Sequence, residues 1–352
     1  MFTVVHLIPT GVGAAIGGFA GDGGPAAALL GAVCDRLVTH PNAVNGAQLL
    51  GLPPNGLYVE GSALDAWLAG RLALRPVRGR RVGVLIDRAV ERHPVGTLEA
   101  LHHAIDAVRA VHGLPFAGCA LTPRPVGAHV RAGAHGHSTG GVADPEALLE
   151  GARCLLAEGA EAIAVVADLG PLDPAAEAAY DQGCGVDPIG GIEAILSHLV
   201  VSALGVPAAH APLWPYEPTQ PRPVDARAAA EHLGHTFLPC VLLGLWRHPS
   251  LVPPSAALPG DLGPGQADAV VVPRGCLGGP GVIAARDRGI PVIVVQENTT
   301  AVPLPPAALG WPPGPTLVEV ANYWEAAGLL AGWRAGLEPW SARRPWPPRP
   351  GP

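Results

Sequence analysis

Two short segments of the chain place proton-transfer groups directly after predicted strands. His40 lies in the sequence THPNAVNG, with Asn42 and Asn45 behind it, and Glu60 ends the sequence YVE. Open α/β sheets bind their ligands at the carboxyl ends of the strands. We therefore expect His40 and Glu60 to act in acid–base or metal-assisted catalysis, with the two asparagines orienting a substrate. An Asx-type turn around a structural histidine is the alternative.

Two further candidates lie in the middle of the chain. Asp187, in GCGVDPIGG, precedes a predicted helix at 189–204 and is either an acid–base group or a simple helix N-cap. His210 ends a predicted strand at 207–210, which makes it a candidate by position. His198 lies on an otherwise apolar stretch of the predicted helix, so we assign it to the core.

Two glycine-rich loops could hold an anion. The first follows the first predicted strand and the second opens a predicted helix at 279–288; the candidate ligand-binding residues are Thr10, Gly11, Gly13, Gly17 and Gly18 in the first and Gly278 and Gly279 in the second. Glycine lets the backbone approach a ligand, and the N–H groups at a helix start favour negative charge. The G-x-G-x-x-x-G spacing departs from the dinucleotide fingerprint, so an anion site is favoured, with a dinucleotide site and a structural turn as alternatives.

Two polar clusters complete the candidates. Glu297 and Asn298 lie in QENTT at the end of a predicted strand and are expected to contact the ligand or a second lobe. His135 and His137 lie in HGHSTGG, where the H-x-H spacing suits a metal and the Ser-Thr-Gly-Gly sequence suits an anion. A plain surface loop is the third interpretation. Cys276 would be a nucleophile only if the neighbouring helix start stabilised its thiolate.

The composition limits the chemistry. All 22 basic residues are arginine, so a Schiff base to pyridoxal phosphate and a Walker A loop are both excluded. The remaining chemistry uses histidine and carboxylates, a hydroxyl or thiol nucleophile, or a divalent metal, and no cofactor is specified. Only five asparagines occur in the 352 residues, and we expect each to have a specific role.

The charge and the hydropathy limit the partners. A net charge of −7 and a pI near 6.0 argue against nucleic acid. Beyond the N-terminal run, the cleanest apolar stretch is 237–246, which is shorter than the ~20 residues that span a bilayer. No basic residue precedes the apolar N-terminal run, which is unlike a signal peptide. We therefore expect a cytoplasmic protein that binds a small anionic molecule and no membrane, and we leave a homo-oligomer open.

Short apolar strands alternate with alanine-rich helices, which is typical of an α/β fold with a mostly parallel sheet and flanking helices. Two Rossmann-like lobes would fit this pattern, with a site between them. We expect an N-terminal α/β lobe at 1–211, a C-terminal α/β lobe at 225–336 and a mobile Pro/Trp-rich tail at 339–352. Strands are expected at 3–8, 37–39, 56–59, 81–87, 116–121, 162–167, 207–210, 269–272, 291–295 and 316–320, and helices at 25–34, 62–70, 97–112, 145–158, 189–204, 225–233, 279–288 and 322–335.

Several motifs together resemble a known family. The sequences LIPTGVGAAIGGFAGD, THPNAVNGA, YVEG, GVDPIGGIEAILSH, HTFLPCVLLGL and VVQENTT are similar to those of an uncharacterised family of bacterial, cyanobacterial and plastid proteins. The resemblance extends to roughly Gly336 and implies a single unit. It implies no reaction and no cofactor.

The residues favour an enzyme over a passive binder. The leading hypothesis is a hydrolase, lyase or isomerase that acts on a small phosphorylated or carboxylated metabolite. A nucleotide-cofactor oxidoreductase is the second hypothesis, although no acidic residue ends the second strand to bind a ribose. A non-catalytic ligand sensor or assembly factor is the third, and a site without a histidine–carboxylate pair would favour it.

Overall fold

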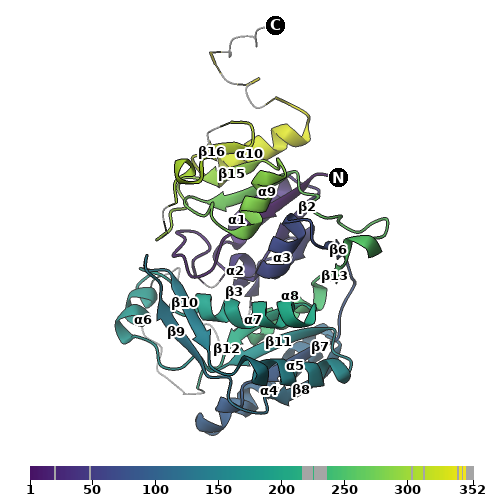
Figure 1. Ribbon diagram of the computed structural model, residues 1–352, viewed down its shortest axis with the longest axis vertical. Helices are drawn as coiled ribbons and strands as arrows, with labels where there is room; N and C mark the ends of the chain where they lie inside the picture. The colour runs from purple at the N-terminus through teal and green to yellow at the C-terminus, as the bar shows by residue number, and fades with distance from the viewer. Residues whose placement is uncertain are drawn as a thin grey trace.

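The computed structural model describes residues 1–19, 21–46, 49–215, 225, 236–302, 304–311, 314–338, 341–342 and 344–345. Two parallel β-sheets form two lobes that are stacked along the long axis of the molecule (Figure 1). We call them the six-stranded lobe and the four-stranded lobe. The fold is thus α/β, as the sequence predicts.

The six-stranded sheet combines strands from both ends of the chain. They are β1 (Thr3–His6), β2 (Arg36–Thr39), β5 (Gly56–Tyr58), β14 (Ala269–Pro273), β15 (Val292–Val295) and β16 (Leu317–Val320). Their order is β16-β15-β14-β1-β2-β5, and every neighbouring pair is parallel. Counted along the chain this is the doubly wound order 3-2-1-4-5-6, in which the order of strand addition reverses between β1 and β14.

Two pairs of helices cover this sheet. On one face α1 (Gly24–Ala32) and α10 (Tyr323–Arg334) pack over Val4, and on the other α3 (Gly61–Leu68) and α9 (Pro280–Asp287) pack over Val5. Successive strand residues point to opposite faces, so Val4 and Val5 enter two separate cores. A sheet covered on both faces explains why β1, β14 and β15 are buried along their whole length.

The four-stranded sheet is also parallel, with the order β12-β11-β7-β8. Its strands are β7 (Val82–Ile86), β8 (Phe116–Leu121), β11 (Ala162–Ala167) and β12 (Ala208–Pro212). Residues of α4 (Thr97–His112) and α8 (Leu238–Arg247) pack on one face, and those of α5 (Pro145–Ala157) and α7 (Gly190–Leu204) on the other. Both α7 and α8 lie on the side of the six-stranded lobe (Figure 1).

Shorter elements connect the lobes and decorate them. They are α2 (Pro41–Val44), α6 (Pro174–Asp181), the pair β3 (Asn45–Gly46) and β4 (Leu49–Leu50), the pair β6 (Ala73–Arg75) and β13 (Ser250–Val252), the hairpin of β9 (Ala128–Ala132) and β10 (Ser138–Val142), and the 3-10 helices η1 (Arg88–Arg92), η3 (Pro254–Ala256) and η4 (Pro306–Leu309). Within the described ranges, no helix is both long enough and apolar enough to cross a membrane.

All ten strands expected from the sequence are present, within two residues at each end. Apart from Asp225, the expected helix at 225–233 lies outside the described residues, as does most of the expected tail at 339–352. The expected lobes at 1–211 and 225–336 do not coincide with the sheets, since β1 pairs with β14. The six-stranded sheet joins β1, β2 and β5 to β14, β15 and β16. The four-stranded lobe is therefore an insertion between β5 and β14 in the sequence.

Candidate functional site

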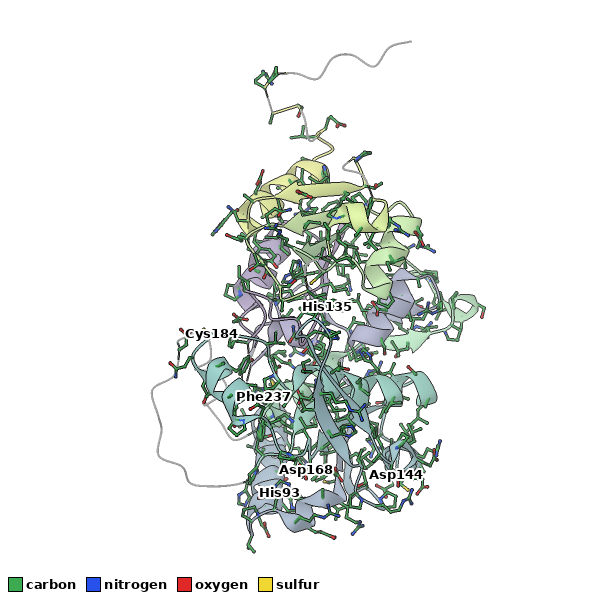
Figure 2. The ribbon with its side chains drawn as sticks, turned by 60° about the vertical axis from the view of Figure 1, so that its left-hand side comes forward. His93, His135, Asp144, Asp168, Cys184 and Phe237 are labelled. Carbon is green, nitrogen blue, oxygen red and sulfur yellow. The ribbon has the colours of Figure 1, made fainter. Side chains whose placement is uncertain are left out.

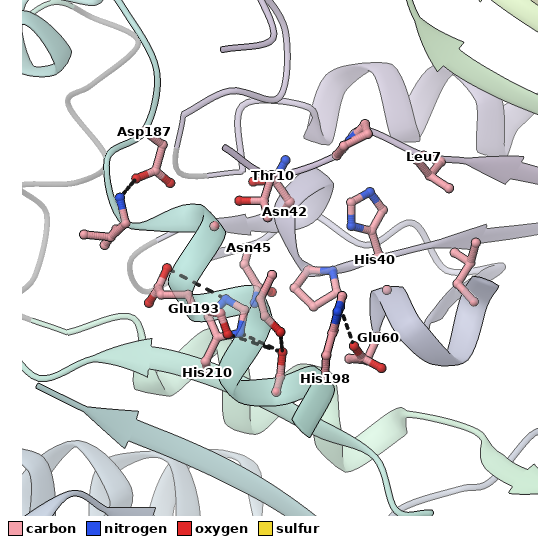
Figure 3. A pocket seen from close by; sticks show the side chains of 18 of the residues that line it. Leu7, Thr10, His40, Asn42, Asn45, Glu60, Asp187, Glu193, His198 and His210 are labelled. Carbon is pink, nitrogen blue, oxygen red and sulfur yellow. Dashed lines mark hydrogen bonds and ion pairs between the residues drawn. The ribbon is translucent and has the colours of Figure 1, made fainter. Parts of the chain in front are cut away.

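A cavity of about 350 Å³ lies between the two lobes, which we call the interlobe cavity (Figure 3). The six-stranded lobe supplies Leu7, Pro9, Thr10, Gly18, Gly21, His40, Pro41, Asn42, Asn45, Glu60, Gly61, Leu64, Asp65, Gly279 and Pro280. The remainder of the lining is Asp187, Ile189, Gly191, Glu193, Ala194, Ser197, His198, His210, Phe237 and Val241, from the four-stranded lobe. The position follows from the topology, because the segments after β1, β2 and β5 all emerge at the carboxyl edge of the sheet.

The structure brings all four predicted acid–base residues to this cavity. His40 and Glu60 come from the six-stranded lobe, and Asp187 and His210 from the four-stranded lobe. Thr10, Gly18, Asn42, Asn45 and Gly279 of the predicted ligand-binding set also line it. Residues separated by 150 positions or more along the chain therefore share one cavity.

Glu60 is held rigidly at the start of α3. It is 2% exposed, and its carboxylate accepts hydrogen bonds from Ser62 N (2.9 Å), Ser62 Oγ (2.7 Å) and Ala63 N (3.1 Å). His198 Nε2 lies 3.0 Å from Oε1 of the same carboxylate. A carboxylate has about four acceptor positions, and these four contacts fill them. Glu60 therefore orients other groups, and it is not itself free to take a proton from a ligand.

The main chain of Glu60 is fixed as well. Its N–H donates to Nε2 of the fully buried His248 (3.0 Å), whose Nδ1 donates to the Pro249 carbonyl (2.7 Å). Burial by itself would raise the pKa of Glu60, but the hydrogen bonds from His198 and Ser62 hold it below its ordinary value. The carboxylate is thus ionised at neutral pH.

His198 is the residue that the sequence analysis assigned wrongly to the core. It projects from α7 into the cavity, and 42% of its side chain is exposed. Burial lowers its pKa, but the hydrogen bond and charge of Glu60 and the charge of Asp65 outweigh burial and raise it above the ordinary value. Because Nε2 carries the proton donated to Glu60, Nδ1 holds the lone pair in the neutral ring. His198 therefore has the geometry of a base oriented by a carboxylate.

His40 is a neutral hydrogen-bond donor. It is 7% exposed, and its Nε2 accepts the N–H of Ile8 (2.8 Å), two residues after the end of β1. A nitrogen that accepts cannot carry the proton, so the proton must sit on Nδ1. Burial lowers the pKa of His40 to about 4, which agrees with this neutral form. Among the described residues Nδ1 has no hydrogen-bond partner, and the ring lines the cavity (Figure 3).

His210 is also neutral, but both of its ring nitrogens contact side chains of α7 in the same lobe. Its Nδ1 lies 3.0 Å from Ser197 Oγ, and its Nε2 lies 3.8 Å from Oε2 of Glu193. Burial lowers the pKa of His210 to about 3, with a further contribution from the charge of His198. Ser197 and Glu193 are four residues apart on α7 and therefore share one helix face. This cluster forms the floor of the cavity.

Asp187 and Asp65 carry half-buried carboxyl groups at two other helix starts. Asp187 Oδ1 accepts the N–H of Ile189 (2.9 Å) in front of α7, and Asp65 Oδ1 accepts the N–H of Gly281 (2.9 Å) in α9. Burial raises the pKa of each carboxyl to about 6. Asp187 is therefore not the N-cap of α7, which is Ile189, but it binds backbone N–H groups at that helix start and also lines the cavity. No sequence signal marked Asp65, which lies within an ordinary amphipathic helix.

The two asparagines of THPNAVNG mainly hold the loops of the cavity. Asn42 Nδ2 donates to the carbonyls of Ile8 and Gly17 (2.9 Å each), which ties the glycine loop to the end of β1. Asn45 Nδ2 donates to the Tyr58 hydroxyl (2.9 Å), while its Oδ1 is buried with no partner among the described residues. All five asparagines of the chain make side-chain hydrogen bonds, as the composition predicts.

Most of the predicted glycines serve packing. Gly11, Gly13 and Gly17 all have positive φ and do not line the cavity. A Cβ on Gly17 would lie 2.4 Å from Ile8, and one on Gly11 would lie 2.9 Å from Ser138 of β10. Gly278 faces Leu304 and also lies outside the cavity. The glycine loop therefore brings Thr10 and Gly18 to the cavity, whereas Gly11, Gly13 and Gly17 pack against other parts of the protein.

Glu297 and Asn298 hold the α10 side of the sheet and lie outside the cavity lining. Asn298 is fully buried: its Oδ1 accepts the N–H of Ile16, and its Nδ2 donates to the Ile16 carbonyl and the Tyr323 hydroxyl, each at 2.9 Å. Glu297 is exposed and accepts from the N–H of Tyr323 (3.4 Å). This polar cluster connects the glycine loop to α10.

We expect the substitution Asn298→Ala to destabilise the protein by roughly 3 kcal/mol, because it leaves the buried N–H and C=O groups of Ile16 unpaired. Thermal or denaturant unfolding measures the loss. The matched control is Asn322→Ala at the half-buried N-cap of α10, with an expected cost of about 1 kcal/mol. If the two variants were equally stable, the bridging role of Asn298 would be refuted.

The remaining candidates lie apart from the cavity. His135 is exposed in the turn between β9 and β10 (Figure 2), and His137 lies two residues further on. Among the residues that the structure describes, no three His, Cys, Asp or Glu side chains are placed to hold a metal ion. Cys276 is buried, and burial raises the pKa of its thiol to about 12, so the stabilised thiolate considered for it does not form.

The sheets and the cavity together define the class of protein. It is a two-lobed α/β protein whose doubly wound sheet presents a histidine- and carboxylate-lined cavity to an inserted second lobe. The chain belongs to the family described as "Protein of unknown function (DUF3326)", whose model matches residues 3–343. This confirms the resemblance seen in the sequence motifs.

One curated relative is an uncharacterised lipoprotein of Synechococcus sp., which is 43% identical over 344 residues, or 96% of this chain and 92% of the relative. No solved structure matches the chain. The description of the relative as a lipoprotein contradicts the cytoplasmic location expected from the sequence, and we withdraw that expectation. It rested on the lack of a spanning apolar segment, which a lipid anchor does not require.

Proposed function

We propose that the protein is an enzyme that transfers protons on a small molecule bound in the interlobe cavity. The observation that carries the proposal is the contact of 3.0 Å between the saturated carboxylate of Glu60 and Nε2 of the half-exposed His198. A histidine oriented by a buried carboxylate is the arrangement that general bases use. The histidine–carboxylate pair also argues against the non-catalytic sensor.

In this proposal Nδ1 of His198 removes a proton from the bound molecule. Glu60 keeps the ring in place and stabilises the imidazolium that forms. His40 then donates its Nδ1 proton in a hydrogen bond to an oxygen on which negative charge develops. Isomerases and lyases begin with such a step, and a hydrolase could use the same base on water. The reaction class beyond proton removal stays a prediction.

A nucleotide-cofactor enzyme is the second candidate, and the strand order of the six-stranded sheet supports it. Dinucleotides bind at the reversal point of this order, which is next to the glycine loop after β1. The acidic residue that would bind a ribose is missing, because β2 ends at Thr39 and is followed by His40. Fluorescence titration with nicotinamide and flavin cofactors tests this candidate, and binding that His40→Gln abolishes would favour it.

The proposal is tested by incubating the purified full-length protein with a defined mixture of polar metabolites and following each compound by mass spectrometry. We expect one compound to be converted by the wild type and not by the double variant His40→Gln/His198→Gln. Solvent deuterium incorporation into that compound would report proton transfer directly. Conversion that the double variant retains would remove the proposal.

A further inference from the structure

Three helix N-termini meet at the interlobe cavity, and the chain's own carboxylates already occupy each of them. Glu60 binds the first N–H groups of α3, Asp65 binds Gly281 N at the start of α9, and Asp187 binds Ile189 N in front of α7. A helix N-terminus attracts negative charge because its N–H groups are unpaired. These N–H groups are paired with the protein's own carboxylates, so they are not open to an anionic ligand.

The ionisable groups of the described lining are predominantly acidic. Four of them are carboxyls, three are histidines and none is arginine. Burial keeps His40 and His210 neutral, since it lowers their pKa values to about 4 and about 3. The positive charge that His198 can carry is matched by Glu60, 3.0 Å away. A bound anion would therefore be repelled by the carboxylates of the lining, with no arginine there to attract it.

An independent observation shows what the cavity lacks. The ring of His40 is more than nine-tenths buried, its Nε2 is locked by Ile8 N, and its Nδ1–H faces the cavity without a partner among the described residues. Because this N–H opens into the cavity, its acceptor is a water molecule or an atom of a bound ligand. A carbonyl or hydroxyl oxygen satisfies it without adding a charge.

We propose that the ligand of the interlobe cavity is an uncharged or cationic small molecule with a carbonyl or hydroxyl oxygen that accepts from His40, and is neither a phosphate nor a carboxylate. The inference rests on the proposed function, because it assigns the substrate class of the same cavity. Asp65 and Asp187 then face a group that donates hydrogen bonds or carries positive charge. Asp65 has one oxygen bound to the N–H of Gly281, the carboxyl of Asp187 accepts from the backbone of Ile189 and Gly190, and both residues line the cavity.

The test is equilibrium dialysis of the full chain against a defined mixture of three classes of compound: polyols and amides, amines and amino alcohols, and carboxylates and phosphates. Mass spectrometry measures the retained fraction. We expect the first two classes to be retained at least tenfold more strongly than the third. Strongest retention of an anion, or no retention of any uncharged or cationic compound, would overturn the proposal.

Variants locate the binding. Asp65→Asn is expected to weaken retention of a cationic compound about tenfold and His40→Gln to weaken retention of any ligand, whereas Asp173→Asn, at the exposed N-cap of α6, leaves it unchanged. The wild-type result stands even where a variant misfolds, which circular dichroism would reveal. Retention of a cation that is never converted would contradict the proposed function and leave the ligand class supported. If the protein converts an anion and that conversion requires His198, the ligand class proposed here is contradicted and the proposed function is supported.

Discussion

Replacing His198 by glutamine is expected to lower kcat by roughly two to four orders of magnitude on the substrate that the metabolite mixture identifies. Glutamine can still donate a hydrogen bond to Glu60, so the carboxylate keeps a partner and the fold is retained. It has no group that takes up a proton at neutral pH, so the base is lost. Steady-state kinetics measure the change, and KM is expected to shift far less than kcat.

The matched control is His102→Gln on the exposed face of α4, which should leave kcat unchanged. His40→Gln is expected to lower kcat by roughly two orders of magnitude, because it removes a donor aimed at the developing charge. A His198→Gln variant with wild-type kcat would contradict the assignment of the base, whatever the substrate is.

The second large effect is expected for Glu60→Gln, which keeps the size of the side chain and removes its charge. Loss of charge-assisted hydrogen bonds at a buried site should cost about 2 kcal/mol of unfolding free energy. The pKa of His198 should fall, because the hydrogen bond and the negative charge of Glu60 are the main causes that raise it. The pH–rate profile should therefore shift to lower pH, with a lower plateau because the base is weaker.

The pH dependence of stability follows from the same pair. The folded-state pKa of His198 lies above 6.5, so its contribution is complete below pH 6.5 and is lost as pH rises through the folded pKa. The folded-state pKa of Glu60 lies below 4.5, so its contribution is present above pH 4.5 and is lost as pH falls through that lower value. The wild type should therefore exceed Glu60→Gln in stability most clearly between pH 4.5 and 6.5.

Asp173→Asn provides the control for this variant, since Asp173 is also an N-cap carboxylate but lies at an exposed helix start. Its stability difference from the wild type should be small and nearly independent of pH over this range. If Glu60→Gln behaved like Asp173→Asn in urea unfolding at pH 5.5, the Glu60–His198 pair would have no energetic role.

Strand ends were the most informative feature of the sequence. The strands were recognisable as short apolar runs, and polar residues placed directly after them, such as His40 and Glu60, reach the cavity. The reason is geometric, because parallel strands deliver the residues that follow them to a single edge. Asn298 follows the same rule and was still misassigned, since β15 delivers it to the α10 side, where it bridges Ile16 and Tyr323.

Residues within helices were much harder to recognise. His198 and Asp65 reach the cavity from the sides of α7 and α3, where a polar residue in an apolar pattern looks like a satisfied core group. The polar residues Glu193, Ser197 and His198 cluster within two turns of α7, and that clustering was the available signal. The insertion of the four-stranded lobe was not predictable, because nothing local in β1 indicates that it pairs with β14.

The anionic ligand was predicted from glycines whose main role proves to be packing. Gly17 lets the Ile8 side chain pack close to the backbone, and Gly11 does the same for Ser138 of β10. These glycines therefore make room for neighbouring parts of the protein rather than for a ligand. Sequence spacing alone does not distinguish the two uses, because both need a residue without a side chain at positive φ.

The most direct test of the central claim needs no substrate. It is an NMR titration of the His198 Cε1–H resonance in the wild type and in Glu60→Gln, assigned by its loss in His198→Gln. We expect His198 to titrate above pH 6.5 in the wild type and at a clearly lower pH in Glu60→Gln. A wild-type value at or below 6.5, or one that Glu60→Gln leaves unchanged, would show that Glu60 does not prepare His198 as a base.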